Sequence, residues 1–153
     1  MQRRREILDL IMTGKYHHTL DQKSRVSIPS QLRKKVGEVL HITISEDDFL
    51  VGYTDEGWIK FNKLLDRLPE DESAFFRGNS ADCAIDAQGR VFIPQDLRDM
   101  AGLETNVVIR GNGDTLQIWK EETFELRHAD MAKRDKIAGI KKKVQAMKER
   151  DAE

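Results

Sequence analysis

The chain has 153 residues, of which 35% are charged and 39% hydrophobic. This length supports one domain, or two small ones, with a buried core, and the composition excludes disorder along the whole chain. Apolar stretches such as residues 7–12 are far shorter than the roughly 20 residues of a membrane-spanning helix, and the N-terminus lacks the features of a signal peptide. We therefore predict a cytoplasmic protein without a membrane partner, and the single cysteine, Cys83, agrees with a reducing compartment.

Charge is distributed unevenly along the chain, although the net charge is only −1. Residues 1–40 carry nine Lys/Arg against four Asp/Glu, residues 46–72 carry three against nine, and residues 133–150 carry eight against two. Because the net charge predicts no nucleic-acid partner, such a partner has to be inferred from the distribution of charge and from motifs.

An internal repeat organises the sequence. With an offset of 65, residues 18–33 align without a gap on residues 83–98, and seven of the sixteen positions are identical. The identical pairs are Asp21/Asp86, Arg25/Arg90, Val26/Val91, Ile28/Ile93, Pro29/Pro94, Leu32/Leu97 and Arg33/Arg98. Two copies are too few for a solenoid, so the repeat predicts two halves packed around a pseudo-twofold axis.

Each copy begins with a predicted strand, turn and strand, because alternating apolar residues flank a short polar segment. Gly89 suits a turn position with positive φ, whereas Ser24 at the equivalent position carries a steric penalty from its Cβ. Short helices are then predicted at 30–36 and 95–101, ending at Gly37 and Gly102. Paired strands follow at 40–44 with 49–53 and at 107–110 with 115–119.

The halves are predicted to be joined by helices. A helix capped by Thr54 or Asp55 runs to about residue 67, with an apolar face of Trp58, Phe61, Leu64, Leu65 and Leu68. A short acidic helix at 70–76 follows, with Phe75 and Phe76 packed into the core. The predicted segments are an N-terminal extension (1–13), a first repeat (14–68), a connecting helix (69–78), a second repeat (79–120) and a charged C-terminal helix (121–153).

The C-terminal helix carries a narrow apolar stripe, Ile137, Ile140, Val144 and Met147. This spacing is typical of helix pairing, so one interpretation is a partner helix. The other is a helix laid back on its own domain.

The repeated element Asp-x-x-(Ser/Gly)-Arg-Val-x-Ile-Pro resembles the signature of the MraZ family, within the wider AbrB-like group of transcription factors. The resemblance extends from residue 14 to residue 119. It implies an α+β fold in which two homologous AbrB-like β-rich halves form one small swapped-hairpin-type barrel, with a long C-terminal helix. It also implies a nucleoid-associated regulator of the bacterial division and cell-wall gene cluster, which binds short direct repeats in double-stranded promoter DNA and assembles with itself into a ring.

Six basic or amide residues are the candidates for DNA contact. Lys23 and Arg25 belong to one hairpin tip, Gln88 and Arg90 to the other, and Arg33 and Arg98 to the helices after the prolines. A two-stranded ribbon fits the major groove, where Arg and Lys bond guanine and Gln bonds adenine. The same side chains could instead bind phosphates, and the sequence leaves both roles open.

The residues of the turns also allow a purely structural interpretation. Arg25 and Arg90 could pair with Asp21 and Asp86 across their own turns, and Arg33 and Arg98 could lie on solvated helix faces. The resemblance favours DNA contact for Lys23 and Arg25, and it implies that Asp21, Ser24, Asp86 and Gly89 shape the turns. Where this chain has Ser24 the family usually has glycine, and Gln88 replaces a lysine.

An enzyme is not predicted. Asp21 and Asp86 are each followed four residues later by an arginine, which would keep them ionised and so excludes an aspartic-protease dyad. Cys83 has no assignable catalytic partner, and the four histidines show no ligand spacing, so no metal and no cofactor are predicted. The alternative function is a ring-forming assembly protein without specific DNA binding, in which the acidic and basic stretches are subunit contacts.

Overall fold

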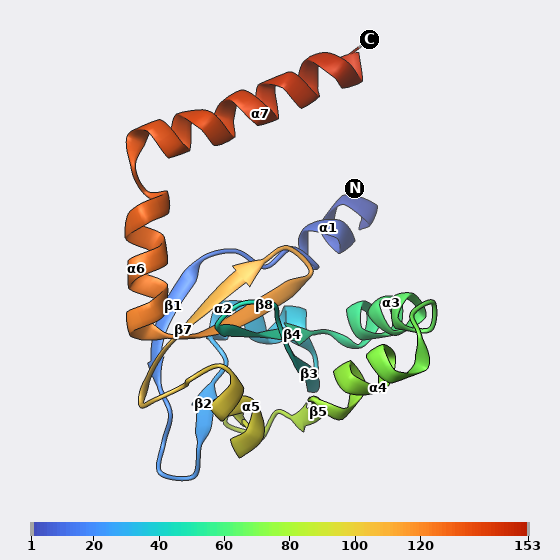
Figure 1. The fold of residues 1–153 in the computed structure, drawn as a ribbon, viewed down its shortest axis with the longest axis vertical. Helices are drawn as coiled ribbons and strands as arrows, with labels where there is room; N and C mark the ends of the chain where they lie inside the picture. Colours follow the sequence, from blue (N-terminus) through green and yellow to red (C-terminus); the bar gives the residue numbers. More distant parts are fainter. Residues whose placement is uncertain (1, 153) are drawn as a thin grey trace. The chain divides into compact units, whose positions relative to one another are not determined.

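The computed structural model describes residues 2–152, without the side chains of residues 2, 3 and 5, and it mixes helices with strands (Figure 1). It divides into two compact units, residues 1–121 and residues 122–153. In chain order the elements are α1 (Gln2–Leu8), β1 (Lys15–Thr19), β2 (Arg25–Ser27), α2 (Ser30–Val36), β3 (Val39–Ile44), β4 (Phe49–Tyr53), α3 (Asp55–Leu65), α4 (Glu70–Gly78), β5 (Ser80–Ala84), β6 (Arg90–Phe92), α5 (Gln95–Met100), β7 (Asn106–Asn112), β8 (Thr115–Lys120), α6 (Glu121–Met131) and α7 (Arg134–Ala152). Within the described residues, every helix is too short or too polar to span a membrane.

The sheets are built by strands from both repeats. A six-stranded antiparallel sheet has the order β1-β7-β8-β4-β3-β5, and a separate two-stranded ribbon joins β2 to β6. Strand β1 of the first repeat pairs with β7 of the second, and β5 of the second pairs with β3 of the first, so each repeat supplies an edge strand to the other. The other two cross-repeat contacts, β4 with β8 and β2 with β6, join equivalent strands. Neither repeat therefore completes these sheets alone.

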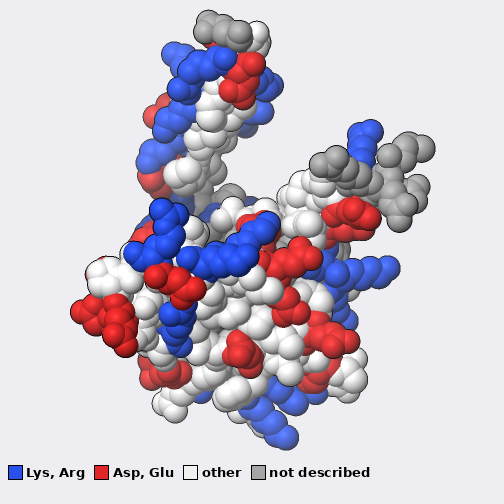
Figure 2. All heavy atoms as spheres, turned by 90° about the vertical axis from the view of Figure 1, so that its right-hand side faces the viewer, with Lys and Arg blue, Asp and Glu red and all other residues white. Residues whose placement is uncertain are grey.

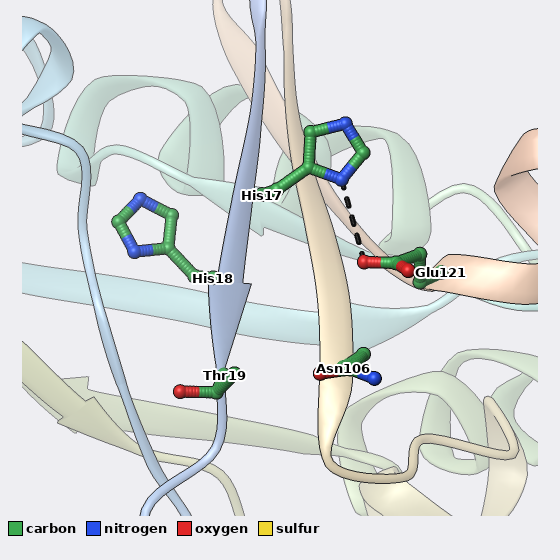
Figure 3. Close-up of a pocket in the computed structure, with 5 residues that line it drawn as sticks. All are labelled: His17, His18, Thr19, Asn106 and Glu121. Atoms are coloured by element: carbon green, nitrogen blue, oxygen red, sulfur yellow. Dashed lines mark hydrogen bonds and ion pairs between the residues drawn. The ribbon is translucent and has the colours of Figure 1, made fainter.

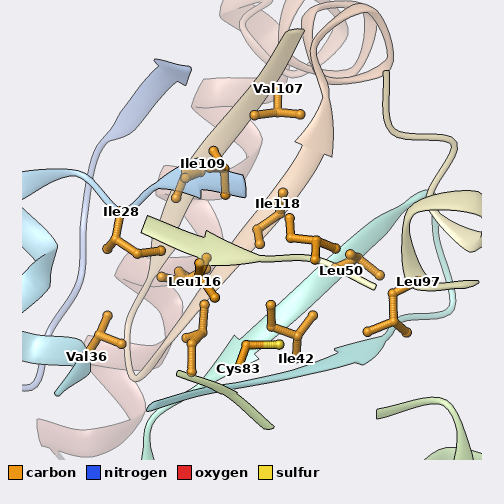
Figure 4. Close-up of a cluster of buried hydrophobic side chains, with 14 of the residues drawn as sticks. Ile28, Val36, Ile42, Leu50, Cys83, Leu97, Val107, Ile109, Leu116 and Ile118 are labelled. Atoms are coloured by element: carbon orange, nitrogen blue, oxygen red, sulfur yellow. The ribbon is translucent and has the colours of Figure 1, made fainter. Parts of the chain in front are cut away.

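The core is shared by the two repeats in equivalent positions (Figure 4). Val26 and Val91 are opposite each other in the β2–β6 ribbon and are fully buried, and Leu32 of α2 and Leu97 of α5 are buried in the same cluster. The large sheet adds Leu40, Ile42, Leu50, Val107, Ile109, Leu116 and Ile118. Because burial of apolar area is the main stabilising term in folding, this shared core holds the two repeats together.

Several local predictions are confirmed. Helix α2 and strand β4 have the predicted bounds, and β3, β7 and β8 extend beyond theirs by one or two residues at an end. Gly37 and Gly102 follow α2 and α5 with φ of 91° and 62°. Thr54 caps α3, because its hydroxyl accepts the backbone N–H of Gly57 at 3.2 Å.

The prediction for the apolar residues of α3 and α4 is wrong in part. Leu64 is 60% exposed and Phe75 is 55% exposed, and Leu68 is exposed as well. The contacts of these helices run instead through Phe61 and Phe76, whose rings meet edge to face at 5.9 Å. Helical periodicity indicates one face of a helix, but it does not show how much of that face other elements cover.

The single C-terminal helix is also corrected, because α6 and α7 are separate helices. Shifting α3 and α4 by the repeat offset of 65 places their connection, residues 66–69, on residues 131–134, where α6 gives way to α7. The break is therefore the second copy of the α3–α4 turn. Asp130 forms ion pairs with Lys133 and Lys136 across it.

Part of the segment predicted as an N-terminal extension belongs to the core. Met12 is only 1% exposed and pairs with Gly113, and the chain at residues 12–13 crosses directly over Gly111. A Cβ at residue 111 would lie 2.4 Å from the backbone nitrogen of Thr13. Glycine is therefore needed at this position for a close approach of two backbones.

His41 connects three elements at a junction between the repeats. Its Nδ1 lies 2.7 Å from Asp82 of β5, its Nε2 lies 2.7 Å from Asp55 of α3, and its ring stacks on Trp58. Burial of the ring lowers the pKa of His41, but the hydrogen bonds and charges of Asp55 and Asp82 outweigh burial and leave the pKa raised. Protonated His41 donates from both ring nitrogens, which matches the two carboxylates.

We predict that the contribution of His41 to stability decreases at alkaline pH. A raised pKa in the folded state stabilises the protein fully below the unfolded value of 6.5, and this stabilisation is lost as the pH rises through the folded pKa. The free energy of unfolding of the wild type should therefore exceed that of His41→Gln most at acidic pH. Urea titrations at several pH values measure this difference, and a constant difference would contradict the prediction.

We predict that Gly111→Ala destabilises the first unit by about 3 kcal/mol, because the added methyl group meets backbone atoms that cannot move aside. Gly139→Ala in α7 is the control, since a Cβ there meets no atom within 4 Å. The control should leave the urea midpoint unchanged or raise it slightly. Equal midpoints for the two variants would argue against the close approach.

Candidate nucleic-acid interface

The turn that leads into β2 is organised around Asp21. Its Oδ1 accepts the backbone N–H groups of Lys23 at 2.8 Å and Arg25 at 2.9 Å, and its main-chain oxygen accepts the N–H of Ser24 at 3.0 Å. Ser24 has a φ of 59° and is the one non-glycine residue with positive φ in the described part of the chain. Aspartate commonly closes turns in this way because its short side chain reaches the backbone two residues ahead.

The turn that leads into β6 has the same hydrogen bonds. Oδ1 of Asp86 accepts the backbone N–H groups of Gln88 and Arg90, each at 2.9 Å, and its main-chain oxygen accepts the N–H of Gly89 at 2.9 Å. Gly89 has a φ of 80°. The two turns therefore have the same backbone hydrogen bonds, and the residue with positive φ is serine in one and glycine in the other.

The arginines of the motif are held by these aspartates. Nε of Arg25 donates to Oδ2 of Asp21 at 2.9 Å, and Nε of Arg90 donates to Oδ2 of Asp86 at 3.3 Å. Nη1 of Arg90 also lies 3.7 Å from Asp21, across the repeats. In each turn the backbone N–H of the arginine is the main cause that lowers the pKa of the aspartate, and its guanidinium lowers the pKa further, so both carboxylates are ionised at neutral pH. The ion pairs are the ones expected from the structural interpretation of the motif.

The side chains at the outer ends of the turns differ between the repeats. Lys23 and Gln88 are exposed, and so are Gln22 and Ala87 beside them. Sequence reasoning missed Gln22, although its place between Asp21 and Lys23 in a polar turn indicated exposure. One tip therefore presents an amide and an ammonium group, and the other presents an amide next to a methyl group.

The two tips lie at opposite ends of the β2–β6 ribbon. In its antiparallel register Arg25 is paired with Phe92 and Ser27 with Arg90, so each turn adjoins the far end of the other strand. In Figure 1 the turn before β2 projects from the body of the first unit. Figure 2 shows acidic and basic side chains interspersed on the side that carries α3 and α4, with basic side chains at the lower end, the end where this turn lies in Figure 1.

Arg98 is partly buried and Arg33 is exposed, and the side chains of both reach the turns. Nε of Arg33 donates to the main-chain oxygen of Ile28 at 2.8 Å. Its guanidinium lies against Gly89, while Nη1 of Arg98 donates to the hydroxyl of Ser24. Each helix arginine thus reaches the turn of the other repeat.

A second candidate is an open hollow of about 360 Å³ lined by His17, His18, Thr19, Asn106 and Glu121 (Figure 3). His17 and His18 point to opposite sides of β1, and Nδ1 of His17 lies 3.4 Å from Glu121. Burial is the main cause that lowers the pKa of His18, and the charges of Arg33 and His17 add to the effect. The described residues contain no group of three or more His, Cys, Asp or Glu placed to hold a metal ion.

Two further candidates carry no chemistry of their own. Cys83 is buried, and burial raises the pKa of its thiol to about 11, so it is a poor nucleophile.

The apolar stripe of α7, from Ile137 to Met147, is partly exposed. In a heptad pattern the positions that flank this stripe are all basic: Lys136, Lys141, Lys143, Lys148 and Arg150. Pairing of two α7 helices would place like charges together, which disfavours a coiled coil between copies.

Comparisons with known proteins identify the family. The model of a family described as "MraZ protein, putative antitoxin-like" matches the chain twice, over residues 11–74 and 75–147. The Transcriptional regulator MraZ of Caldicellulosiruptor saccharolyticus is 36% identical over 126 residues, covering 78% of this chain and 88% of that protein. The Oenococcus oeni protein of the same name is 36% identical over 132 residues, covering 82% and 92%. The chain belongs to the MraZ family.

One solved structure is related only distantly. The solution structure of PHS018 from Pyrococcus horikoshii has a TM-score of 0.32 and 17% sequence identity, over 71% of this chain and 87% of that chain. A similarity of this size supports no argument about fold or function.

We predict that Asp21→Ala lowers the urea midpoint more than Asp86→Ala, because Asp21 also faces Arg90 of the other repeat. Asp48→Ala, at an exposed position in the β3–β4 turn, is the control and should have little effect. Since the pKa values of Asp21 and Asp86 are lowered in the folded state, both effects should disappear as the pH falls through those values. A larger effect for Asp86→Ala would contradict the prediction.

Proposed function

We propose that this chain is a sequence-specific, double-stranded-DNA-binding transcriptional regulator. The observation that carries the proposal is the presentation of two rigid turns, with exposed Lys23 and Gln88, at opposite ends of one ribbon. The relatives named transcriptional regulators support it, since they match most of the chain. The role is non-catalytic and requires no cofactor.

The chemistry of the tips suits the edges of bases and the DNA backbone. Lys23 bonds guanine or phosphate, and the amides of Gln22 and Gln88 bond adenine. Arg25 and Arg90 each present a guanidinium with five N–H donors, so they contact DNA while one edge remains on aspartate. The DNA contact that the sequence predicts for Arg33 and Arg98 is tested below, against a positioning role, by the salt dependence of binding.

The finer parts of the proposal concern the target and the assembly. The target is the promoter of the bacterial division and cell-wall gene cluster, in the cytoplasm at the nucleoid, with short direct repeats as binding sites. Single tips on a chain of net charge −1 bind weakly, so a ring-like homo-oligomer on tandem sites gains affinity through effective concentration. The pairing of β1 with β7 and of β5 with β3 supports two AbrB-like repeats, 14–68 and 79–120, in a swapped-hairpin-type barrel.

A second candidate is a ring-forming assembly protein without specific DNA binding. The acidic stretch 46–72 and the basic stretch 133–150 favour it, because they suit each other as subunit contacts. A salt titration separates the two functions. A ring held by charge dissociates with salt in the absence of DNA, whereas DNA binding through phosphates falls linearly in a plot of log affinity against log salt.

We predict that Lys23→Ala weakens binding to the DNA upstream of the protein's own gene by about tenfold, because one contact to a base or phosphate is lost. Lys63→Ala is the control, since it removes the same charge from an exposed position on α3. Fluorescence anisotropy with this DNA and with a scrambled duplex measures both variants. Equal affinities for wild type and Lys23→Ala would refute the proposed interface.

A further inference from the structure

The helix arginines cross between the repeats in a reciprocal way. Arg98 belongs to α5 of the second repeat, and its Nη1 donates to the hydroxyl of Ser24 in the first turn. Arg33 belongs to α2 of the first repeat, and a Cβ built on Gly89 in the second turn would lie 2.3 Å from both Cζ and Nε of Arg33. Gly89 is buried although it lies in a turn. Each turn is therefore covered by a guanidinium from the other repeat.

The main chain follows the same exchange. The N–H of Ile28 donates to the oxygen of Gly89 at 2.8 Å, and the N–H of Ile93 donates to the oxygen of Ser24 at 3.1 Å. Arg33 in turn binds the oxygen of Ile28. The residue with positive φ in each turn is thus held by the opposite repeat through its backbone and through an arginine side chain.

The two crossings differ because residue 24 is serine. At the second turn, the absence of a Cβ on Gly89 leaves room for Arg33, whose Nε finds the oxygen of Ile28. At the first turn, the side chain of Ser24 occupies the corresponding space, so Arg98 bonds the hydroxyl instead. Nε of Arg98 is buried without a hydrogen-bond partner in the described structure. Where Arg33 packs on Gly89 in the second turn, Arg98 therefore forms a hydrogen bond with Ser24 in the first turn. The φ of Ser24 disfavours any residue that has a Cβ.

We propose that Arg33 and Arg98 are positioning residues that hold the turn of the opposite repeat, and that Ser24 is the receptor for Arg98. The inference rests on the proposed function, because the turns it concerns are the proposed DNA contacts. The arginines set the placement of Lys23 and Gln88 and link the two tips, and they do not bind phosphates. Because the hydroxyl of Ser24 accepts this hydrogen bond from Arg98, the turn tolerates serine at a position that otherwise favours glycine.

The first test measures the turns without DNA. Amide hydrogen exchange of the full chain should become at least fivefold faster at Gln88 and Gly89 in Arg33→Ala, and at Lys23 and Ser24 in Arg98→Ala. Arg67→Ala, which removes an exposed arginine of the α3–α4 connection, should change neither turn. Arg98→Lys keeps the positive charge but removes the planar guanidinium. This variant is measured in place of Arg98→Ala if Arg98→Ala does not fold. Unchanged exchange in the opposite turn would overturn the proposal.

The second test separates positioning from phosphate binding. Loss of a phosphate contact reduces the slope of log affinity against log salt by about 1 and weakens binding to all DNA alike. For Arg33→Ala and Arg98→Ala we expect an unchanged slope and a fivefold or greater loss of preference for the upstream DNA over a scrambled duplex. A reduced slope with equal losses on both duplexes would overturn the proposal. If the wild type shows no preference, the proposed function fails, while the exchange measurement still decides the positioning role.

The third test compares two substitutions of Ser24. Ser24→Gly removes the Cβ, so Arg98 can pack on the turn as Arg33 packs on Gly89, and slow exchange of the first turn should be retained. Ser24→Ala keeps the Cβ and removes the acceptor, so exchange should become at least fivefold faster. Equal exchange rates in the two variants would overturn the role of the hydroxyl.

Discussion

The structure depends on the pairing of strands from different repeats. Strands β2 and β6 have three residues each and bury Val26 and Val91 only by facing one another. Short strands of this kind are not stable alone, because the hydrogen bonds they form do not offset the loss of conformational entropy. In the large sheet, β1 and β5 likewise find their partner strands in the other repeat. One chain therefore folds as an intramolecular pair, and its two motifs reach equivalent positions at the ends of one ribbon.

The two repeats differ where the pairing of their strands does not constrain them. Helix α4 leads into β5 and contributes Phe76 to the core, whereas its counterpart α7 continues as a charged helix in the second unit. The turns diverged in the same way at residues 24 and 89. Such differences make two tips of one fold unequal in charge and in the way they are held, which gives an asymmetric surface on a pseudo-symmetric frame.

The motif uses each aspartate for two tasks. The carboxylate of Asp21 accepts two backbone N–H groups and also holds the guanidinium of Arg25. These donors keep the carboxylate ionised, and the carboxylate restricts the arginine to few conformations. A side chain that is ordered before binding loses less entropy when it meets a base or a phosphate. The arrangement lets the same residues serve both the turn and the proposed nucleic-acid interface.

The sequence by itself determined the features that depend on neighbours along the chain. Helix α2 with Gly37 and strand β4 follow from local spacing, and the Thr54 cap and the Asp–Arg pairs were each one of two alternatives that local spacing offered, because their partners are within a few residues. Only the tertiary structure decided which apolar faces are covered, as at Leu64 and Phe75, since periodicity does not show what packs against a face. It alone brought Arg98 to Ser24, 74 residues away, and His41 to Asp82, 41 residues away. Contacts between distant residues depend on how the strands pair, and that pairing is a property of the whole chain.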